Sequence, residues 1–132
     1  SAWGSSANGA LGLVILLDQF PRNSFRGTRQ MYESDVRARQ IADAAIKAGH
    51  DRTVGGPLSL FFYMPFAHSE DLADQEKSVA LVQRLGQPHL AHAEGHRDII
   101  RRFGRFPHRN PILGRATTKE EQQFLDAGGY AG

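Results

Sequence analysis

Arginine and phenylalanine side chains gather in two stretches of the sequence, and arginine is the residue type best suited to binding an anion. A guanidinium group holds a carboxylate or a phosphate through two parallel hydrogen bonds. We therefore predict a site for a small anionic molecule. Its expected ligand-binding residues are Arg22, Asn23, Arg26, Asp35, Glu70, Gln75, Arg105, Arg109 and Asn110.

Two other interpretations of the same arginines stay open. The first is structural, because buried arginines are usually neutralised by carboxylates, and ion pairs of this kind would lock the loops together. The acidic residues available for such pairing are Asp18, Asp35, Glu70 and Asp71. The second is single-stranded nucleic acid, which binds where basic groups alternate with aromatic rings.

Proton transfer is the second chemistry that the sequence offers, in the segment from His68 to Asp71. A histidine beside a carboxylate can accept and return a proton near neutral pH. The candidate catalytic residues are His68, His108 and Asp71. In the alternative interpretation, Ser69 is the N-cap of a helix and the two carboxylates after it favour the positive end of the helix dipole. The sequence leaves open whether a reaction takes place.

Three histidines, His89, His92 and His96, follow one another at helical spacing. Positions three and four apart share one face of a helix, and imidazoles placed in this way can bind zinc or nickel. The zinc-protease pattern of two histidines around a glutamate is missing, and His96 shares its face with Ile99 and Phe103. A histidine satisfied within the core is the favoured interpretation, so we predict no metal site and no cofactor.

The composition is that of an ordinary folded domain. The chain has 132 residues, of which 40% are hydrophobic and 23% charged, enough for one core and too few for two. The net charge of +2 is small for a nucleic-acid partner. The absence of cysteine excludes disulfide bonds and thiol catalysis, and no apolar run is long enough to span a membrane. We expect a single helical domain over residues 1–132, located in the cytoplasm.

Apolar residues recur at helical spacing and no segment alternates as a strand does, which predicts an all-α fold of about six helices. Glycine, proline and capping residues mark the helix ends. The expected helices cover residues 7–20, ended or redirected by Pro21; 28–48, capped by Thr28; 58–64, ended by Pro65; 69–85, capped by Ser69; 88–104; and a short helix to Leu125 that begins at Thr117 or Thr118. A buried strand stays the alternative for residues 7–20, and the tail 128–132 is expected to fray.

Polar residues interrupt the apolar faces of two expected helices. Asp35 lies within the apolar stripe of residues 28–48, and Gln75 and Ser78 lie on or beside the stripe of residues 69–85. A buried carboxylate without a partner is costly, so we expect Asp35 to meet an arginine or a backbone donor. Polar groups that break an apolar pattern often mark a functional site.

Several long strings together resemble a bacterial family, the domain of unknown function 924. These strings are Leu16-Leu17-Asp18-Gln19-Phe20-Pro21-Arg22-Asn23, Phe25-Arg26-Gly27-Thr28, Phe61-Phe62-Tyr63-Met64-Pro65-Phe66-Ala67-His68-Ser69-Glu70-Asp71, Arg102-Phe103-Gly104-Arg105-Phe106-Pro107-His108-Arg109-Asn110 and Leu113-Gly114-Arg115, with Asp35, Gln75, Ser78 and His96 between them. The match covers the chain from about Trp3 to Leu125. The resemblance implies a tetratricopeptide-like fold of helical hairpins, and it implies no established activity.

Members of that family usually carry a further segment before the position of Trp3. The resemblance therefore implies that the chain is the C-terminal part of a longer family domain. Residues 7–20 would then lose part of their cover, and exposed apolar surface of this kind tends to self-associate. We accordingly expect a homo-oligomer.

Functions of different classes remain open at this point. A small-molecule site is favoured, in which arginines bind an anionic ligand and a histidine moves protons. The alternative is a protein- or peptide-interaction module, because tetratricopeptide-like helix pairs present a groove; RNA binding, with its steep salt dependence, is a further alternative. A closed pocket lined by the loop arginines favours the first function, and an open concave helical surface favours the second.

Overall fold

The computed structural model describes residues 5–132, and most of this range is helical, with no strand in it. The predicted all-α fold is confirmed. Trp3, where the family resemblance begins, lies outside the described residues. None of the helices within residues 5–132 is both long enough and apolar enough to cross a membrane.

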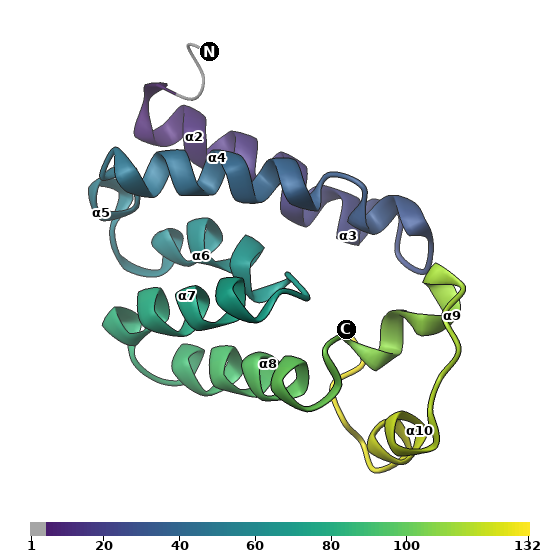
Figure 1. Cartoon of the computed structure of the whole chain (residues 1–132). Helices are drawn as coiled ribbons and strands as arrows, with labels where there is room; N and C mark the ends of the chain where they lie inside the picture. The colour runs from purple at the N-terminus through teal and green to yellow at the C-terminus, as the bar shows by residue number, and fades with distance from the viewer. Residues whose placement is uncertain (1–4) are drawn as a thin grey trace.

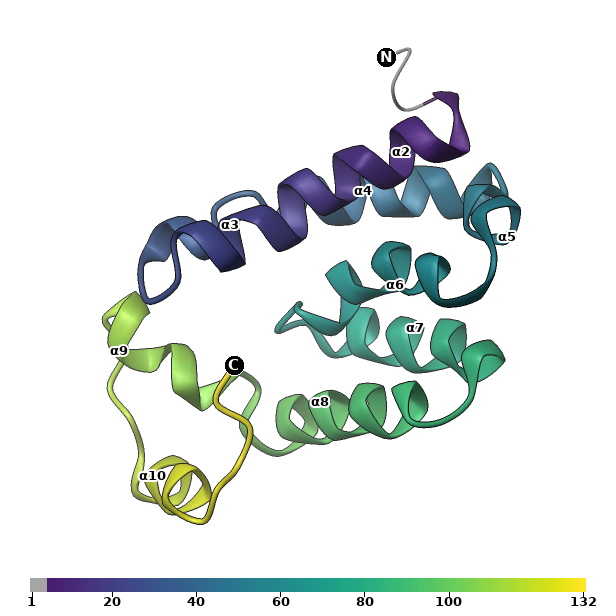
Figure 2. The same ribbon diagram turned by 180° about the vertical axis from the view of Figure 1, so that it is seen from behind.

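Two layers of helices make up most of the molecule (Figure 1). In one layer, α2 (Ala7–Val14) and α4 (Asp35–Lys47) lie side by side. In the other, α6 (Leu60–Ala67), α7 (Leu72–Val82) and α8 (His89–Phe103) stack one upon the next. The view from behind shows the same order (Figure 2). The main core lies where the layers meet and is built from Val14, Ala42, Ala45, Phe62, Tyr63, Phe66, Val79 and Val82, among others.

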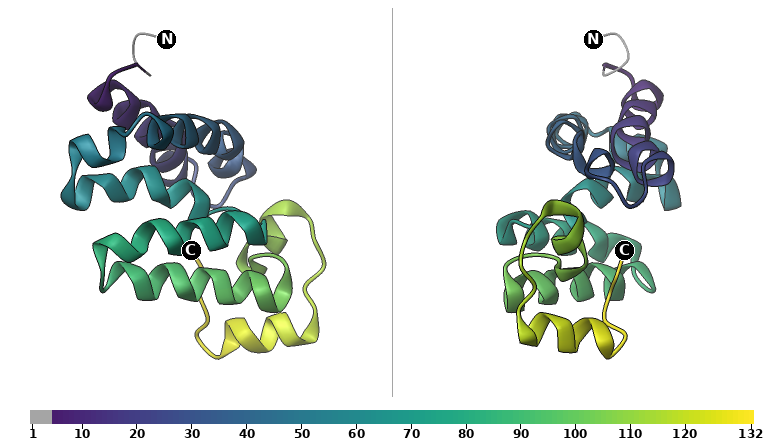
Figure 3. Two further views of the ribbon diagram at one scale, coloured as in Figure 1. Left: turned by 60° about the vertical axis from the view of Figure 1, so that its left-hand side comes forward. Right: turned by 90° about the vertical axis from the view of Figure 1, so that its right-hand side faces the viewer.

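Short elements join the layers and close one end. They are α5 (His50–Val54), η3 (Gly56–Ser59), η4 (Gln83–Leu85), η5 (Pro107–Arg109), α9 (Asn110–Leu113) and α10 (Lys119–Asp126). The last of these, α10, lies beyond α8 on the side away from α2 and α4 (Figure 3). It begins with a capping box between Thr118 and Glu121, the second of the two starts that the sequence allows.

The first helix continues through Pro21, so the prediction that this proline ends it is wrong. After α2 the chain forms a π-helix, η1 (Ile15–Gln19), and then α3 (Phe20–Ser24). Proline cannot donate to the carbonyl four residues before it, which here belongs to Leu17. The hydroxyl of Ser34 donates to that carbonyl instead. A side chain from the next element thus replaces the missing helical hydrogen bond.

The second predicted helix is divided in two. A short 3-10 helix, η2 (Arg29–Tyr32), comes first, and α4 begins only at Asp35. Thr28 stands at the N-cap position of η2, but its side chain does not cap the helix, because its hydroxyl donates to the Phe25 carbonyl at 2.7 Å. Asp35 therefore stands at the start of a helix rather than within a helical stripe. Gly49 ends α4 with a φ of 79°, as its glycine predicts.

Two further boundaries differ from the sequence prediction. Pro65 lies inside α6, which continues to Ala67. The cap of α7 is Asp71, whose Oδ1 accepts from the backbone N–H groups of Ala73 and Asp74. Ser69 instead accepts from the N–H of Asp71 and donates to Asp74. The predicted N-cap is displaced by two residues because the carboxylate reaches two donors at once.

Candidate functional site

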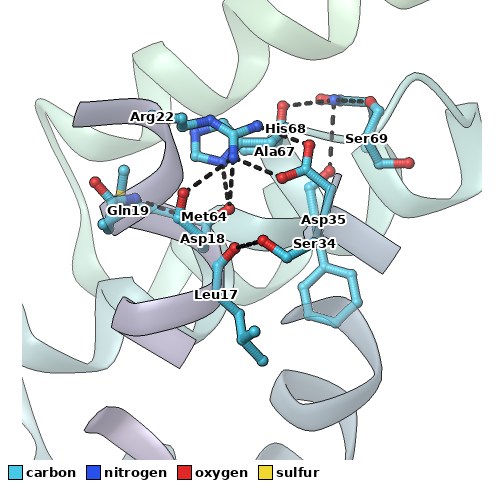
Figure 4. Close-up of polar contacts among 12 residues, drawn as sticks. Leu17, Asp18, Gln19, Arg22, Ser34, Asp35, Met64, Ala67, His68 and Ser69 are labelled. Atoms are coloured by element: carbon cyan, nitrogen blue, oxygen red, sulfur yellow. Dashed lines mark hydrogen bonds and ion pairs between the residues drawn. The ribbon is translucent and has the colours of Figure 1, made fainter. Parts of the chain in front are cut away.

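A buried ion-pair cluster joins the two layers at the end of α6 (Figure 4). Asp18 comes from the π-helix and is only 1% exposed, while Asp35 opens α4. The guanidinium of Arg22 binds Asp35 through two parallel hydrogen bonds of 2.7 and 2.9 Å, and its Nη1 also lies 3.2 Å from Asp18 Oδ1. The expectation that Asp35 meets an arginine is confirmed.

His68 completes this cluster, because its Nδ1 lies 2.8 Å from Asp18 Oδ1. Burial by itself would raise the pKa of Asp18, but the charges of His68 and Arg22 and the hydrogen bonds around the carboxylate outweigh burial and hold that pKa below its ordinary value. An ionised Asp18 therefore accepts the Nδ1 proton of His68, and Nε2 is the ring nitrogen left to gain or lose a proton. Within residues 5–132, His68 Nε2 makes no hydrogen bond.

The backbone around His68 is held as firmly as its ring. The amide nitrogen of Gln75, a fully buried side chain, donates to the carbonyls of Ala67 at 2.8 Å and Ser69 at 2.6 Å. Arg109 Nη2 donates to the carbonyl of His68 itself at 2.7 Å. Three successive carbonyls thus have side-chain partners, which fixes the direction of the imidazole.

A hollow of about 500 Å³ opens beside His68, between α6, α7 and α8. That volume suits a small organic molecule. Its apolar wall includes Leu60, Met64, Ala67, Val82 and Ala93, and its polar wall consists of His68, Ser78, His89, His92, His96 and two tyrosines, Tyr63 and Tyr130. No aspartate or glutamate lines it. The three histidines predicted to share a helical face therefore all face one hollow.

Two fully buried polar side-chain atoms in this wall have no hydrogen-bond partner within the described chain. They are Oγ of Ser78, on α7, and Nδ1 of His96, on α8. Burial lowers the pKa of His96 from 6.5 to about 4, and the neighbouring charges of His68, His92 and others add to this. His96 is accordingly neutral at pH 7 and can accept or donate a hydrogen bond. Unpaired polar groups beside a hollow are the groups that a ligand would satisfy.

Among the described residues, none of the arginines predicted to bind an anion lines this hollow, and several arginines of the loops are paired with carboxylates. Arg105 binds Glu121 at 2.7 and 2.8 Å, and this contact lowers the pKa of Glu121 to about 2. Arg115 binds Glu70 at 2.8 and 3.0 Å. Glu70, predicted as a ligand contact, also accepts from the N–H of Phe106 at 2.7 Å. These pairs lock the segment from η5 to α10 against the start of α7.

Arg109 differs from the other buried arginines because no carboxylate lies within ion-pair distance of it. It is 7% exposed and lies between two rings, 4.3 Å from the centre of Tyr32 and 4.8 Å from that of Phe106. Burial lowers its pKa. The guanidinium of Arg22 lies 5.7 Å from the centre of the same Tyr32 ring, so Arg22 and Arg109 both contact this tyrosine.

The remaining predicted site residues are spread over the molecule. Asn23 and Arg26 are exposed near the end of α3, and Asp71 is an exposed helix cap. Asn110 is buried and accepts from Arg115 at 2.9 Å. His108 is half-buried against Phe106 and Tyr130 and does not line the hollow. The structure thus brings together His68, Gln75, Arg22, Asp35 and Arg109, and it separates the others from them.

The sequence analysis missed Asp18 as the partner of His68 and counted it only among carboxylates that could neutralise arginine. A signal was present, because Asp18 follows five consecutive apolar residues and a carboxylate there must be buried. Ser78 was noticed as a polar group on an apolar stripe but was not assigned to the site. Within residues 5–132, no group of three or more metal-ligating side chains is placed to hold a metal ion.

The family model described as a bacterial protein of unknown function, DUF924, matches residues 1–129. This chain belongs to that family. The solved structure of a protein of unknown function, ATU0120 from Agrobacterium tumefaciens, is similar to it with a TM-score of 0.95 and 55% sequence identity. The similarity covers 97% of this chain and 73% of that one. No curated protein matches this sequence. The DUF924 resemblance seen in the sequence strings is confirmed.

Proposed function

We propose that this DUF924 protein binds a small organic acid in the hollow between α6, α7 and α8, and that His68 exchanges a proton with it. The observation that carries this proposal is the pairing of His68 Nδ1 with the buried, ionised Asp18, which leaves Nε2 as the free nitrogen of a residue that lines the hollow. An imidazole held in one tautomer by a carboxylate is a good general base.

The charges around the hollow support an acidic ligand. Among the described residues, four of its wall side chains are those of histidines and none is that of an aspartate or glutamate. Arg109 lies behind His68 and carries a positive charge that no ion pair neutralises. A negative ligand would meet hydrogen-bond donors and a favourable field, whereas a cation would not. The histidines thus take the role that the sequence analysis gave to the loop arginines.

Titration with butyrate tests the proposal, because butyrate is a small acid that fits within the hollow. We expect butyrate to raise the thermal midpoint of the protein and to shift the imidazole NMR signals of His68 and His96. The variant His68→Gln should lose most of this protection, since it removes the proton-accepting nitrogen while keeping a polar side chain of similar size.

Arg26→Gln is the matched control for this experiment. It removes an exposed arginine from the predicted anion-binding set and leaves the hollow untouched. Binding that survives in Arg26→Gln and fails in His68→Gln supports the proposal. Butyrate that leaves both imidazole signals unmoved at saturating concentration, or that depends on Arg26 instead, contradicts it.

A further inference from the structure

We infer that the ligand of this site is an unbranched alkyl carboxylic acid, whose chain passes Tyr130 into a second hollow between α8 and α10. The inference rests on the proposed function, since the acidic head is the group placed beside His68. It adds the class of ligand, which the first hollow alone does not define.

The second hollow adjoins the first and has a volume of about 390 Å³. Three residues line both, namely His92, His96 and Tyr130. The two hollows therefore share one wall, made by His92 and His96 on α8 and Tyr130 on the C-terminal tail. A single molecule long enough to pass this wall would occupy both hollows.

The far side of the second hollow suits an alkyl chain. Its wall includes Ile99 and the rings of Phe103 and Phe124, whose centres lie 5.3 Å apart. Arg102 lies against these rings, 4.6 Å from the centre of Phe103. These apolar groups line the second hollow, so an alkyl chain lying in it would remove them from water.

Tyr130 stands where the two hollows meet. After α10 the chain turns back across α8 (Figure 3), and the Tyr130 ring comes to lie 4.4 Å from His96 and 5.1 Å from His108, measured between ring centres. No helix or strand holds residues 129–132. The Tyr130 ring is therefore held by its contacts with the histidine rings. A small movement of the tail would widen the opening between the two hollows.

The ligand's chain length is the quantity to vary. We propose measuring the affinity of butyrate, hexanoate, octanoate and decanoate by calorimetry. Burial of each methylene contributes about 0.8 kcal/mol, so the affinity should rise about fourfold per methylene, and the rise should continue through decanoate. If a single hollow holds the ligand, the rise should stop at the shorter acids.

Gly95→Leu blocks the second hollow selectively. Gly95 lines that hollow and not the first, and a Cβ at this position would meet no atom within 4 Å, so a leucine enters the hollow without strain on α8. We expect Gly95→Leu to reduce the affinity for decanoate to near that for butyrate, and to leave butyrate binding unchanged. Gly95→Ala, which adds only one methyl group, is the control and should behave as the parent protein does.

The outcomes separate this inference from the proposed function. Butyrate binding with no gain from longer chains, or decanoate binding that Gly95→Leu does not weaken, overturns the alkyl-chain inference and leaves the proposed function standing. If none of the four acids binds, the proposed function fails and the inference fails with it.

Discussion

Burial keeps the imidazoles of His96 and His108 uncharged, and this ties the stability of the fold to pH. In both side chains burial is the main cause that lowers the pKa from 6.5 to about 4, and nearby positive groups, which include Arg109, add to the effect. Between these two pH values the unfolded chain binds protons that the folded chain does not. The free energy of unfolding must therefore fall as the pH is lowered from about 6.5 to about 4.

We predict that the thermal midpoint declines steadily as the pH is lowered over this range. The decline should be shallower in His96→Gln and in His108→Gln than in the parent protein. The carboxylates Asp18 and Glu70 contribute below this range, because their pKa values lie under the ordinary ones. Scanning calorimetry at half-unit pH intervals measures the slope. His50→Gln is the control, since His50 lies on α5 and is not among the groups that lower the pKa of His96 or His108; an equal flattening in that variant would refute the assignment to His96 and His108.

At the scale of the element, the first helix shows how a side chain far along the chain can replace a backbone hydrogen bond. Pro21 leaves the Leu17 carbonyl without its helical donor, and Ser34 supplies one from the turn before α4. The hydrogen bond from Ser34 to the Leu17 carbonyl is partly buried, and a bond of this kind contributes about 0.5–1.5 kcal/mol to stability. We expect Ser34→Ala to lower the free energy of unfolding by about that amount in urea denaturation.

A double-mutant cycle with Pro21→Ala separates this role from a general effect of losing Ser34. Alanine at position 21 restores an N–H that can donate to the helical carbonyl before it. Ser34→Ala should then cost less in the Pro21→Ala background than in the parent chain. Equal costs in both backgrounds would show that Ser34 does not compensate for the proline.

The sequence could predict the helix ends that neighbouring residues determine, but not those that depend on distant partners. Periodicity placed α8 within a residue of each end, because Pro88 and Gly104 bound it locally. The ends at Pro21, Pro65 and Ser69 could not be predicted, because partners distant in the sequence or competing carboxylates decide them. The site follows the same rule: His68 stood out by its type, whereas its partner Asp18 lies 50 residues away in the sequence, and only the packing of the two layers brings them together.

At the scale of the whole molecule, apolar side chains remain exposed along one edge of the layer that contains α2 and α4. Leu16 is 54% exposed, Phe20 52% and Val36 57%, and all three lie on η1, α3 or the first turn of α4. Phe25, 38% exposed, packs edge-on against Phe20. Apolar side chains gathered in this way favour association with another protein surface.

We expect this chain to self-associate through that edge, so that sedimentation velocity shows a mass that rises with concentration. Replacing Leu16 and Phe20 together with lysine should make the protein monomeric, because both substitutions place a charge where the partner surface would have to exclude water. Leu72→Lys changes an exposed leucine on α7, in the other layer, and should leave the association intact. If the Leu72 variant dissociates as readily, or if the parent chain is a monomer at the highest concentration, the edge of η1 and α3 is not the contact between copies.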